Sequence, residues 1–188
     1  MNSSYMTNPL VFVISTLFQL YAFAIMLRFV LQWVQADFYN PVSQFIVKIT
    51  TPVVKPARRF IPGYKGLDIA SLVVCYLVLS LSQAIVQAIG GYNPTVLTVT
   101  VLAITDLISL VINVFFYAII IQAVISWINP QGHNPINHLL YSITYPVLRP
   151  AQKLIPPLGG LDISPIFALL GLKVIEMLIN PLFYQILK

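Results

Sequence analysis

The stretch that decides the fold runs from Trp33 to Ile69 and reads WVQADFYNPVSQFIVKITTPVVKPARRFIPGYKGLDI. It returns 94 residues later, from Trp127 to Ile163, as WINPQGHNPINHLLYSITYPVLRPAQKLIPPLGGLDI. The two copies are identical at 15 of 37 positions without an insertion, including the tryptophan, an Asn-Pro pair, three further prolines and Gly-Leu-Asp-Ile. Chance similarity between apolar helices does not place such residues in register, so the chain contains an internal repeat.

The composition around this repeat is that of an integral membrane protein. Of the 188 residues, 59% are hydrophobic and 8% are charged, and the mean hydropathy is +0.88. A soluble domain carries about 25% charged residues, so this chain lacks the polar groups to cover its surface in water. These values exclude a soluble enzyme, a disordered tail and a coiled coil. The single cysteine, Cys75, excludes an intrachain disulfide and a CxxC zinc or redox site.

Four apolar segments are long enough to cross a bilayer, which needs about 20 helical residues. They lie at about 10–34, 69–89, 106–128 and 163–187. The first contains Arg28 near its end, which we expect to snorkel towards the membrane surface. The third belongs to an apolar window from residue 95, which as one helix would reach roughly 50 Å against a hydrocarbon core of about 30 Å. We therefore expect its first turns, up to Asp106, to protrude or to lie at the interface.

Each repeat consists of a span, a loop segment and a second span, with residues 1–94 forming the first repeat and residues 95–188 the second. Because each repeat contains two spans, both enter the membrane in the same orientation, related by a pseudo-twofold axis along the membrane normal. The predicted fold class is an all-α membrane protein with four transmembrane helices in two tandem parallel repeats. An inverted repeat, which is common in secondary transporters, is excluded by this count.

The loop segment of each repeat is predicted to form an amphipathic interfacial helix. Asn40 is a good N-cap, and Pro41 suits the first helical position. The apolar residues that follow have the i, i+3, i+4, i+7 spacing of one helix face. They are Val42, Phe45, Ile46 and Ile49 in the first copy, and Ile136, Leu139, Leu140 and Ile143 in the second. Pro52 and Pro146 are expected to end these helices.

Basic residues gather in the loop segments and predict the orientation of the chain. Those assigned to contact with the membrane surface or a partner are Lys55, Arg58, Arg59, Arg149 and Lys153. The link at 90–95 has none, so the positive-inside rule places both loops in the cytoplasm and both termini outside. We interpret these cations as contacts with anionic lipid, each contributing up to about 1 kcal/mol, or alternatively with a macromolecular partner. The pI near 9.4 then reflects membrane topology and not nucleic-acid binding.

An aspartate opens the second span of each repeat. Asp68 and Asp162 each follow Gly-Leu, and we interpret both as N-caps that also complement the helix dipole. Either can in addition form an ion pair with a loop cation such as Arg59 or Lys153. Nothing in the sequence supports a catalytic role for them.

A charged pair inside the last span breaks the symmetry of the repeats. Counted from Asp162, Lys173 lies about 16 Å and Glu176 about 21 Å into the membrane, where a lone charge costs at least about 2.5–3.5 kcal/mol. At the i, i+3 spacing the two side chains share a helix face and neutralise each other. We interpret the pair either as a packing or oligomer contact, or as part of an ion or proton path. Polar residues of other spans that are expected to line the same interior are Gln83, Gln87, Asn113 and Gln122.

The sequence contains no recognisable catalytic or cofactor site. His133 and His138 lie five residues apart without neighbouring cysteines or carboxylates, which is poor spacing for a metal ion. No span contains a histidine, so a bis-histidine haem site within the bundle is not available. P-loop and dinucleotide fingerprints are absent as well. We therefore expect no enzyme activity, no metal, no cofactor and no small-molecule substrate.

The loop motifs resemble those of the YggT family of small bacterial and plastid membrane proteins. The resemblance is carried by residues 37–45 (DFYNPVSQF), 56–62 (PARRFIP) and 67–71 (LDIAS), and in the second copy by residues 150–156 (PAQKLIP) and 159–165 (GGLDISP). It covers nearly the whole chain and is similar to the two-copy proteobacterial form. The resemblance implies a multi-pass protein of the bacterial inner membrane without known catalytic residues. It also implies links to osmotic stress, cell division or nucleoid distribution in bacteria, and to haem attachment to a b-type cytochrome in plastids.

Two functions are compatible with these observations. The first is a non-enzymatic membrane protein that packs against a membrane-protein partner or a second copy of itself. It would support the assembly or maintenance of membrane complexes and tolerance of osmotic stress. The alternative is a small ion channel or carrier whose path is lined by polar intramembrane residues. The lipid bilayer is a partner in both cases.

Overall fold

The computed structural model describes residues 4–128, 134–154 and 162–187, and within these ranges it has six helices. Their bounds are α1 Ser4–Trp33, α2 Pro41–Ala57, α3 Ile69–Ile89, α4 Val96–Ile128, α5 Pro135–Leu154 and α6 Ser164–Gln185. Four of the described helices, α1, α3, α4 and α6, are long and apolar enough to cross a membrane. The chain is therefore an all-helical protein with four candidate spans and one shorter helix between the spans of each repeat.

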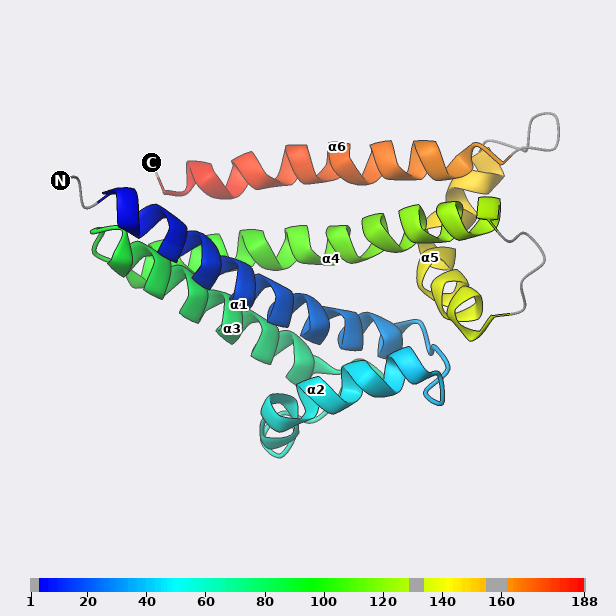
Figure 1. Cartoon of the computed structure of the whole chain (residues 1–188), viewed down its shortest axis with the longest axis horizontal. Helices are drawn as coiled ribbons and strands as arrows, with labels where there is room; N and C mark the ends of the chain where they lie inside the picture. The colour runs from blue at the N-terminus through cyan, green and yellow to red at the C-terminus, as the bar shows by residue number, and fades with distance from the viewer. Residues whose placement is uncertain (1–3, 129–133, 155–161, 188) are drawn as a thin grey trace.

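The four long helices form a bundle in which α4 is central (Figure 1). α1 packs on α3, and α4 contacts α1 and α3 on one side and α6 on the other. The shorter helices α2 and α5 lie at the same end of the bundle, whereas the link between α3 and α4 lies at the opposite end (Figure 1). The end with α2 and α5 is where the polar loop residues of both repeats gather.

The α1–α3 contact is held together by small and aliphatic side chains. Ile25 on α1 and Leu79 on α3 are almost fully buried. Cys75 on α3 is also buried, and its Sγ lies 3.5 Å from the carbonyl oxygen of Ala22. Small residues at such a position let two helix backbones approach closely, which is how helices associate where lipid removes the hydrophobic driving force.

α4 is one continuous helix of 33 residues, so the turns before Asp106 belong to the same helix as the predicted third span. Its first turns pack against the end of α3. Gln83 Nε2 donates to Asp106 Oδ2 at 2.6 Å, and Thr98 Oγ1 donates to Gln87 Oε1 at 3.2 Å. The polar groups of these turns thus find partners on a neighbouring helix, which removes the cost of burying them alone.

The helices between the spans continue through the prolines that were expected to end them. α2 runs past Pro52 to Ala57, and α5 runs past Pro146 to Leu154. Proline removes one backbone donor and crowds the preceding turn. In α2 the carbonyl of Val47, one turn before the proline, accepts from Thr51 Oγ1 at 2.5 Å and from Arg28 Nη1 at 3.4 Å. The carbonyl that loses its helical donor at Pro52 is that of Lys48, so these bonds support the neighbouring turn and link α2 to α1.

The face that α2 presents to the bundle includes three of the four residues predicted by spacing, since Ile46 is buried and Val42 and Ile49 pack half-buried against the core. The buried residues of α2 are Ser43, Ile46, Thr50 and Val54, whereas Phe45 is 59% exposed. Two of the four buried side chains carry hydroxyl groups, and that of Thr50 accepts from Arg28 Nη1 of α1 at 2.9 Å. In α5 the buried set is Leu139, Leu140, Ile143, Thr144 and Leu148, which includes three of the four predicted residues.

Candidate functional site

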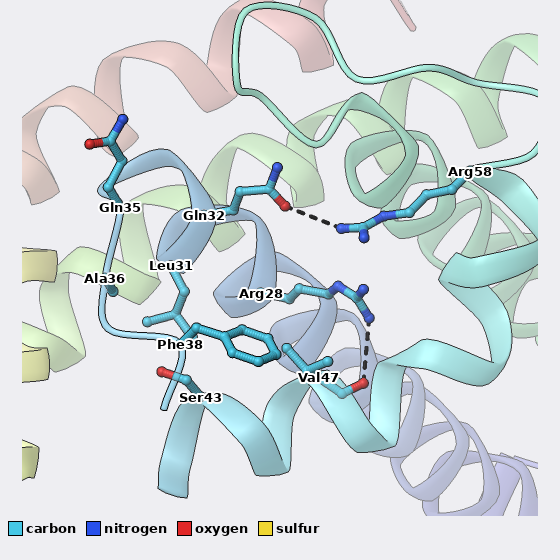
Figure 2. A pocket seen from close by; sticks show the side chains of 9 residues that line it. All are labelled: Arg28, Leu31, Gln32, Gln35, Ala36, Phe38, Ser43, Val47 and Arg58. Atoms are coloured by element: carbon cyan, nitrogen blue, oxygen red, sulfur yellow. Dashed lines mark hydrogen bonds between the residues drawn. The ribbon is translucent and has the colours of Figure 1, made fainter. Parts of the chain in front are cut away.

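The polar residues of the first repeat converge where α1, α2 and the start of α3 meet. An open pocket of about 570 Å³ lies there. Its lining residues are Arg28, Leu31, Gln32, Gln35, Ala36, Phe38, Ser43, Val47 and Arg58. Figure 2 shows the side chains of Arg28 and Arg58 extending towards each other, one from α1 and one from the end of α2.

Asp68 joins the two arginines. Arg58 Nε donates to its Oδ1 at 3.2 Å and Arg58 Nη2 to its Oδ2 at 2.5 Å, and Arg28 Nε lies 3.8 Å from Oδ2. The carboxylate also caps α3 by accepting from the backbone and the hydroxyl of Ser71. Burial by itself raises the pKa of Asp68, but the hydrogen bonds from Arg58 and Ser71 and the charge of Arg58 outweigh it, so the pKa lies below its usual value.

Arg28 is 6% exposed and lies between α1 and α2. Its Nη1 donates to Thr50 Oγ1 at 2.9 Å and to Thr51 Oγ1 at 3.2 Å. A buried charge needs such partners, because removal from water is otherwise very costly. The arginine therefore ties the first span to the following helix.

The second repeat repeats this geometry with neutral side chains. Gln122 occupies the position of Arg28, and its Oε1 accepts from the hydroxyl of Thr144, the counterpart of Thr50. Gln152 occupies the position of Arg58, and its Nε2 donates to Asp162 Oδ2 at 2.9 Å. The polar connections between span and loop helix are thus shared by the two repeats, but the two arginine charges occur only in the first.

The role of Asp162 differs in detail from the prediction. The residue that caps α6 is Ile163, one position later, while Asp162 Oδ1 accepts from Ser164 N at 2.9 Å. Its partner from α5 is Gln152 and not Lys153. Burial slightly opposes ionisation of this exposed carboxylate, but the hydrogen bonds from Ser164 and Gln152 outweigh it, and the pKa of Asp162 lies below its usual value.

The predicted surface cations other than Arg58 stay outside the cluster. Lys55, Arg59, Arg149 and Lys153 are all exposed, at the ends of α2 and α5. Arg149 lies over the ring of Tyr145, 5.4 Å from its centroid. Arg58 alone among the five turns inwards, because Asp68 follows it by ten residues and faces it from the start of α3. Contact of the other four with lipid or a partner stays a prediction.

The charged pair of α6 is formed and is shared with α4. Lys173 Nζ donates to Glu176 Oε2 at 2.7 Å and to Asn113 Oδ1 at 3.0 Å. It also lies over the ring of Phe116 on α4, 4.5 Å from its centroid. One turn further along α6, Asn180 bonds Ser109 of α4. The pair thus belongs to a polar seam between the two helices.

The other polar residues of the spans do not line one common interior. Gln83 and Gln87 bond the early turns of α4, Asn113 bonds Lys173 of α6, and Gln122 bonds Thr144 of α5. Together they belong to three different contacts, α3 with α4, α4 with α6 and α4 with α5. Among the described residues, no three His, Cys, Asp or Glu side chains form a group that could hold a metal ion; His133 lies outside these residues.

Sequence reasoning did not predict the buried cluster around Arg28, although the sequence carries a signal for it. Arg28 is the charged residue of the first apolar span, and the position 94 residues later holds another long polar residue, Gln122. Two polar residues at one repeat position in apolar spans indicate a shared bonding partner. Thr50 and Thr144, which are identical between the repeats, are that partner.

Each of the two repeats matches the same family of known proteins. A profile of the family described as CCB3/YggT matches residues 7–89 and again residues 101–183. This chain belongs to the CCB3/YggT family. Its matched segments each contain a pair of spans and the helix between them, so in this family member the repeat unit is the whole span–helix–span structure.

Relatives in the CCB3/YggT family match over most of their length. The chain is 45% identical over 174 residues to an uncharacterized protein of Pseudomonas aeruginosa, covering 90% of this chain and 87% of the relative. It is 38% identical over 170 residues to the protein YggT of Escherichia coli strain K12, covering 90% and 88%. A protein of Vibrio alginolyticus is 37% identical over 185 residues, covering 95% and 100%. No solved structure matches.

Proposed function

We propose that this chain is a non-enzymatic protein of the bacterial inner membrane that supports the assembly or maintenance of other membrane complexes, and thereby tolerance of osmotic stress. The observation that carries the proposal is the position of α6 at the edge of the bundle (Figure 1). α6 packs mainly on α4 and α5. Only 6% of its apolar window is buried, against 22% to 33% for the other three candidate spans.

The free surface of α6 suits a partner helix. Its exposed large apolar residues are Ile166, Phe167, Leu170, Val174, Ile175, Met177, Leu178 and Leu182. A helix with one long neighbour leaves most of its circumference open to lipid or to another protein. Association of helices within lipid depends on close packing and not on burial from water, so a protein partner must match this surface in shape.

The non-enzymatic part of the proposal is supported by how the charged side chains are used. Asp68 holds Arg58, Asp162 holds Gln152, and Lys173 and Glu176 hold each other. Each of these carboxylates accepts its hydrogen bonds from within the fold. Such groups stabilise the contacts between helices through charge-assisted hydrogen bonds.

The proposed arrangement in the membrane has two parallel repeats, α2 and α5 at the cytoplasmic interface and both termini outside. The common position of α2 and α5 at one end of the bundle supports it (Figure 1). Both helices expose aromatic side chains, including Phe45 and Tyr141, and both carry exposed cations near their ends. Apolar surface together with cations is what an interfacial helix needs to bind anionic lipid.

Photo-crosslinking from α6 in living cells tests the assembly proposal. A photoreactive residue at position 178, where Leu178 is 66% exposed, should give a discrete adduct with one membrane protein. The matched control is position 25, where Ile25 is fully buried and a crosslink should stay within the chain. The complex that contains the captured protein should fall in abundance when this chain is deleted, and growth at high osmolarity should slow.

Two results would contradict the proposal. One is that position 178 yields lipid adducts alone, which would show that no protein covers α6. The other is that the captured complex assembles normally in the deletion strain. In that case the neighbour is adjacent to this chain without depending on it.

A small ion channel or carrier is the second candidate, and the observation that favours it is the Lys173–Glu176 pair within a candidate span. Lys173 keeps 39% of its side chain exposed although it is bonded to Glu176 and Asn113. The discriminating variant replaces both Lys173 and Glu176 with leucine. If the pair is structural, this double variant stays folded and functional, because it removes both charges together. Lost ion flux in liposomes, at normal protein levels, would instead favour the channel.

A further inference from the structure

We propose that the pocket between α1 and α2 binds a phosphate-bearing anion, supplied by the glycerophosphate headgroup of an anionic phospholipid. The pocket has a volume of about 570 Å³. Its lining combines the guanidinium groups of Arg28 and Arg58 with the apolar side chains of Leu31, Phe38 and Val47 (Figure 2). A ligand that fits both parts carries a negative charge next to an apolar body.

The charges of the pocket do not balance. Asp68 is the carboxylate that faces both arginines, and its two oxygens are taken by Arg58. Arg28 makes its hydrogen bonds to neutral acceptors and reaches Asp68 only at 3.8 Å. Between Arg28 and Asp68 the chain has six basic and two acidic residues, and the second acidic residue, Asp37, is exposed and accepts from Tyr39 N. A positive charge is therefore left over beside the pocket.

Two buried donors of the pocket lack a partner. Within the described part of the chain, Arg28 Nε and Ser43 Oγ have no hydrogen bond. Arg28 is 6% exposed and Ser43 is 3% exposed, so water does not readily satisfy either. An unsatisfied buried donor costs free energy, and a phosphate oxygen is a strong acceptor for both guanidinium and hydroxyl groups. An anion in the pocket would satisfy the charge and the donors together.

The second repeat indicates that the fold does not require these two charges. Gln122 bonds Thr144, and Gln152 bonds Asp162, in the places where the first repeat has Arg28 with Thr50 and Arg58 with Asp68. Neutral amides thus support the same connections between helices. The arginines add positive charge to this geometry, and a bound anion would neutralise it.

The choice between two phosphate sources follows from the apolar part of the lining. Free phosphate makes no apolar contact with Leu31, Phe38 and Val47, whereas the glycerol and upper acyl chain of a phospholipid pack against such side chains. The choice of a lipid rests on the proposed interfacial position of α2. The anion site itself depends only on the arginines and is independent of the assembly role of α6.

Binding to the purified full-length protein in detergent tests the site. The probes are short-chain phosphatidylglycerol, short-chain phosphatidylcholine and inorganic phosphate. Titration calorimetry measures the affinity of each. We expect phosphatidylglycerol to bind and phosphatidylcholine not to bind. Arg28→Gln should weaken binding at least about tenfold, because it removes a charged donor, and this variant reproduces the residue found at position 122. Lys65→Gln removes an exposed charge that neither lines the pocket nor belongs to the predicted lipid contacts, and should change the affinity by less than about twofold.

The outcomes separate the sources and decide the proposal. Binding of inorganic phosphate that depends on Arg28 and equals that of the lipid would keep the anion site and identify free phosphate as its ligand. Equal affinity of the native protein and Arg28→Gln for phosphatidylglycerol, or equal affinity of the native protein for both lipids, would overturn the site. If Arg28→Gln fails to fold, Arg58→Gln decides, because Asp68 then neutralises Arg28, and undiminished binding in that variant would overturn the site as well.

Discussion

At the scale of single residues, Asp68 connects three helices. It caps α3, binds Arg58 from the end of α2 through two hydrogen bonds and lies 3.8 Å from Arg28 of α1. Without its charge, two guanidinium groups would face each other beside an apolar bundle. Asp68 therefore stabilises the fold more through its charge than through its capping of α3, which contributes about 1 kcal/mol.

We expect Asp68→Asn to lower the free energy of unfolding by about 2–3 kcal/mol, at or below the range for breaking a buried ion pair. The expected loss is smaller than for a fully buried ion pair, because the Arg58 side chain is 41% exposed and water screens its charge. Thermal unfolding of the detergent-solubilised protein at neutral pH measures the effect. Asp162→Asn is the control and should cost less than about 1 kcal/mol, since the partner of Asp162 is the neutral Gln152. Equal losses in the two variants would contradict this account.

The same carboxylate predicts a dependence on pH. The pKa of Asp68 is lower in the folded chain than its usual value of 3.8, so between these two pKa values the unfolded chain binds more protons. The stabilisation by Asp68 is therefore complete above about pH 4 and is lost as the pH falls through the pKa of the folded chain. Thermal unfolding midpoints measured from pH 7 down to pH 3 should fall more steeply in the native protein than in Asp68→Asn. Parallel curves would show that another group is responsible.

At the scale of elements, α2 shows how tertiary contacts select the face of a helix. The spacing of apolar residues predicted a face containing both Phe45 and Ile46. In the structure Ile46 is 8% exposed and Phe45 is 59% exposed, because Thr50 and Ser43 turn inwards and rotate the buried side. The periodicity of the sequence identified the helix, while the partner on α1 decided its rotation.

A pair of substitutions in α2 tests this rotation. Ile46→Ala should destabilise the protein in detergent by about 2–4 kcal/mol, because it opens a cavity beneath α2. Phe45→Ala should change stability by less than about 0.5 kcal/mol, as expected for an exposed position. Thermal unfolding of both variants provides the comparison. A larger loss of stability in Phe45→Ala than in Ile46→Ala would show that Phe45, and not Ile46, packs on the bundle.

At the scale of the whole molecule, the two repeats form one bundle. α4 of the second repeat contacts α1 and α3 of the first. A side-chain bond also joins the starts of the two shorter helices, since Asn40 Nδ2 donates to the carbonyl oxygen of Pro135 at 2.8 Å. The same asparagine caps α2 by accepting from Val42 N. The starts of the two shorter helices therefore contact each other.

Cysteine labelling tests the arrangement in the membrane. Phe60→Cys and Tyr92→Cys place a thiol at positions that are 86% and 74% exposed, at opposite ends of the bundle, while the native Cys75 is buried. In spheroplasts a membrane-impermeant maleimide should label Tyr92→Cys and leave Phe60→Cys unlabelled until the cells are lysed. Labelling of Phe60→Cys in intact spheroplasts would reverse the proposed orientation.

The sequence alone determined the four apolar helices, the two repeats, the helix between the spans of each repeat and the family. These features depend on hydropathy and on motif register, which are properties of the linear chain. The tertiary structure decided the continuity of α4, the rotation of α2, and the cluster of Arg28, Arg58 and Asp68 with its pocket. The members of this cluster lie 10 to 40 positions apart in the chain. Only the packing of α1, α2 and α3 determines which polar groups must share partners once water is excluded.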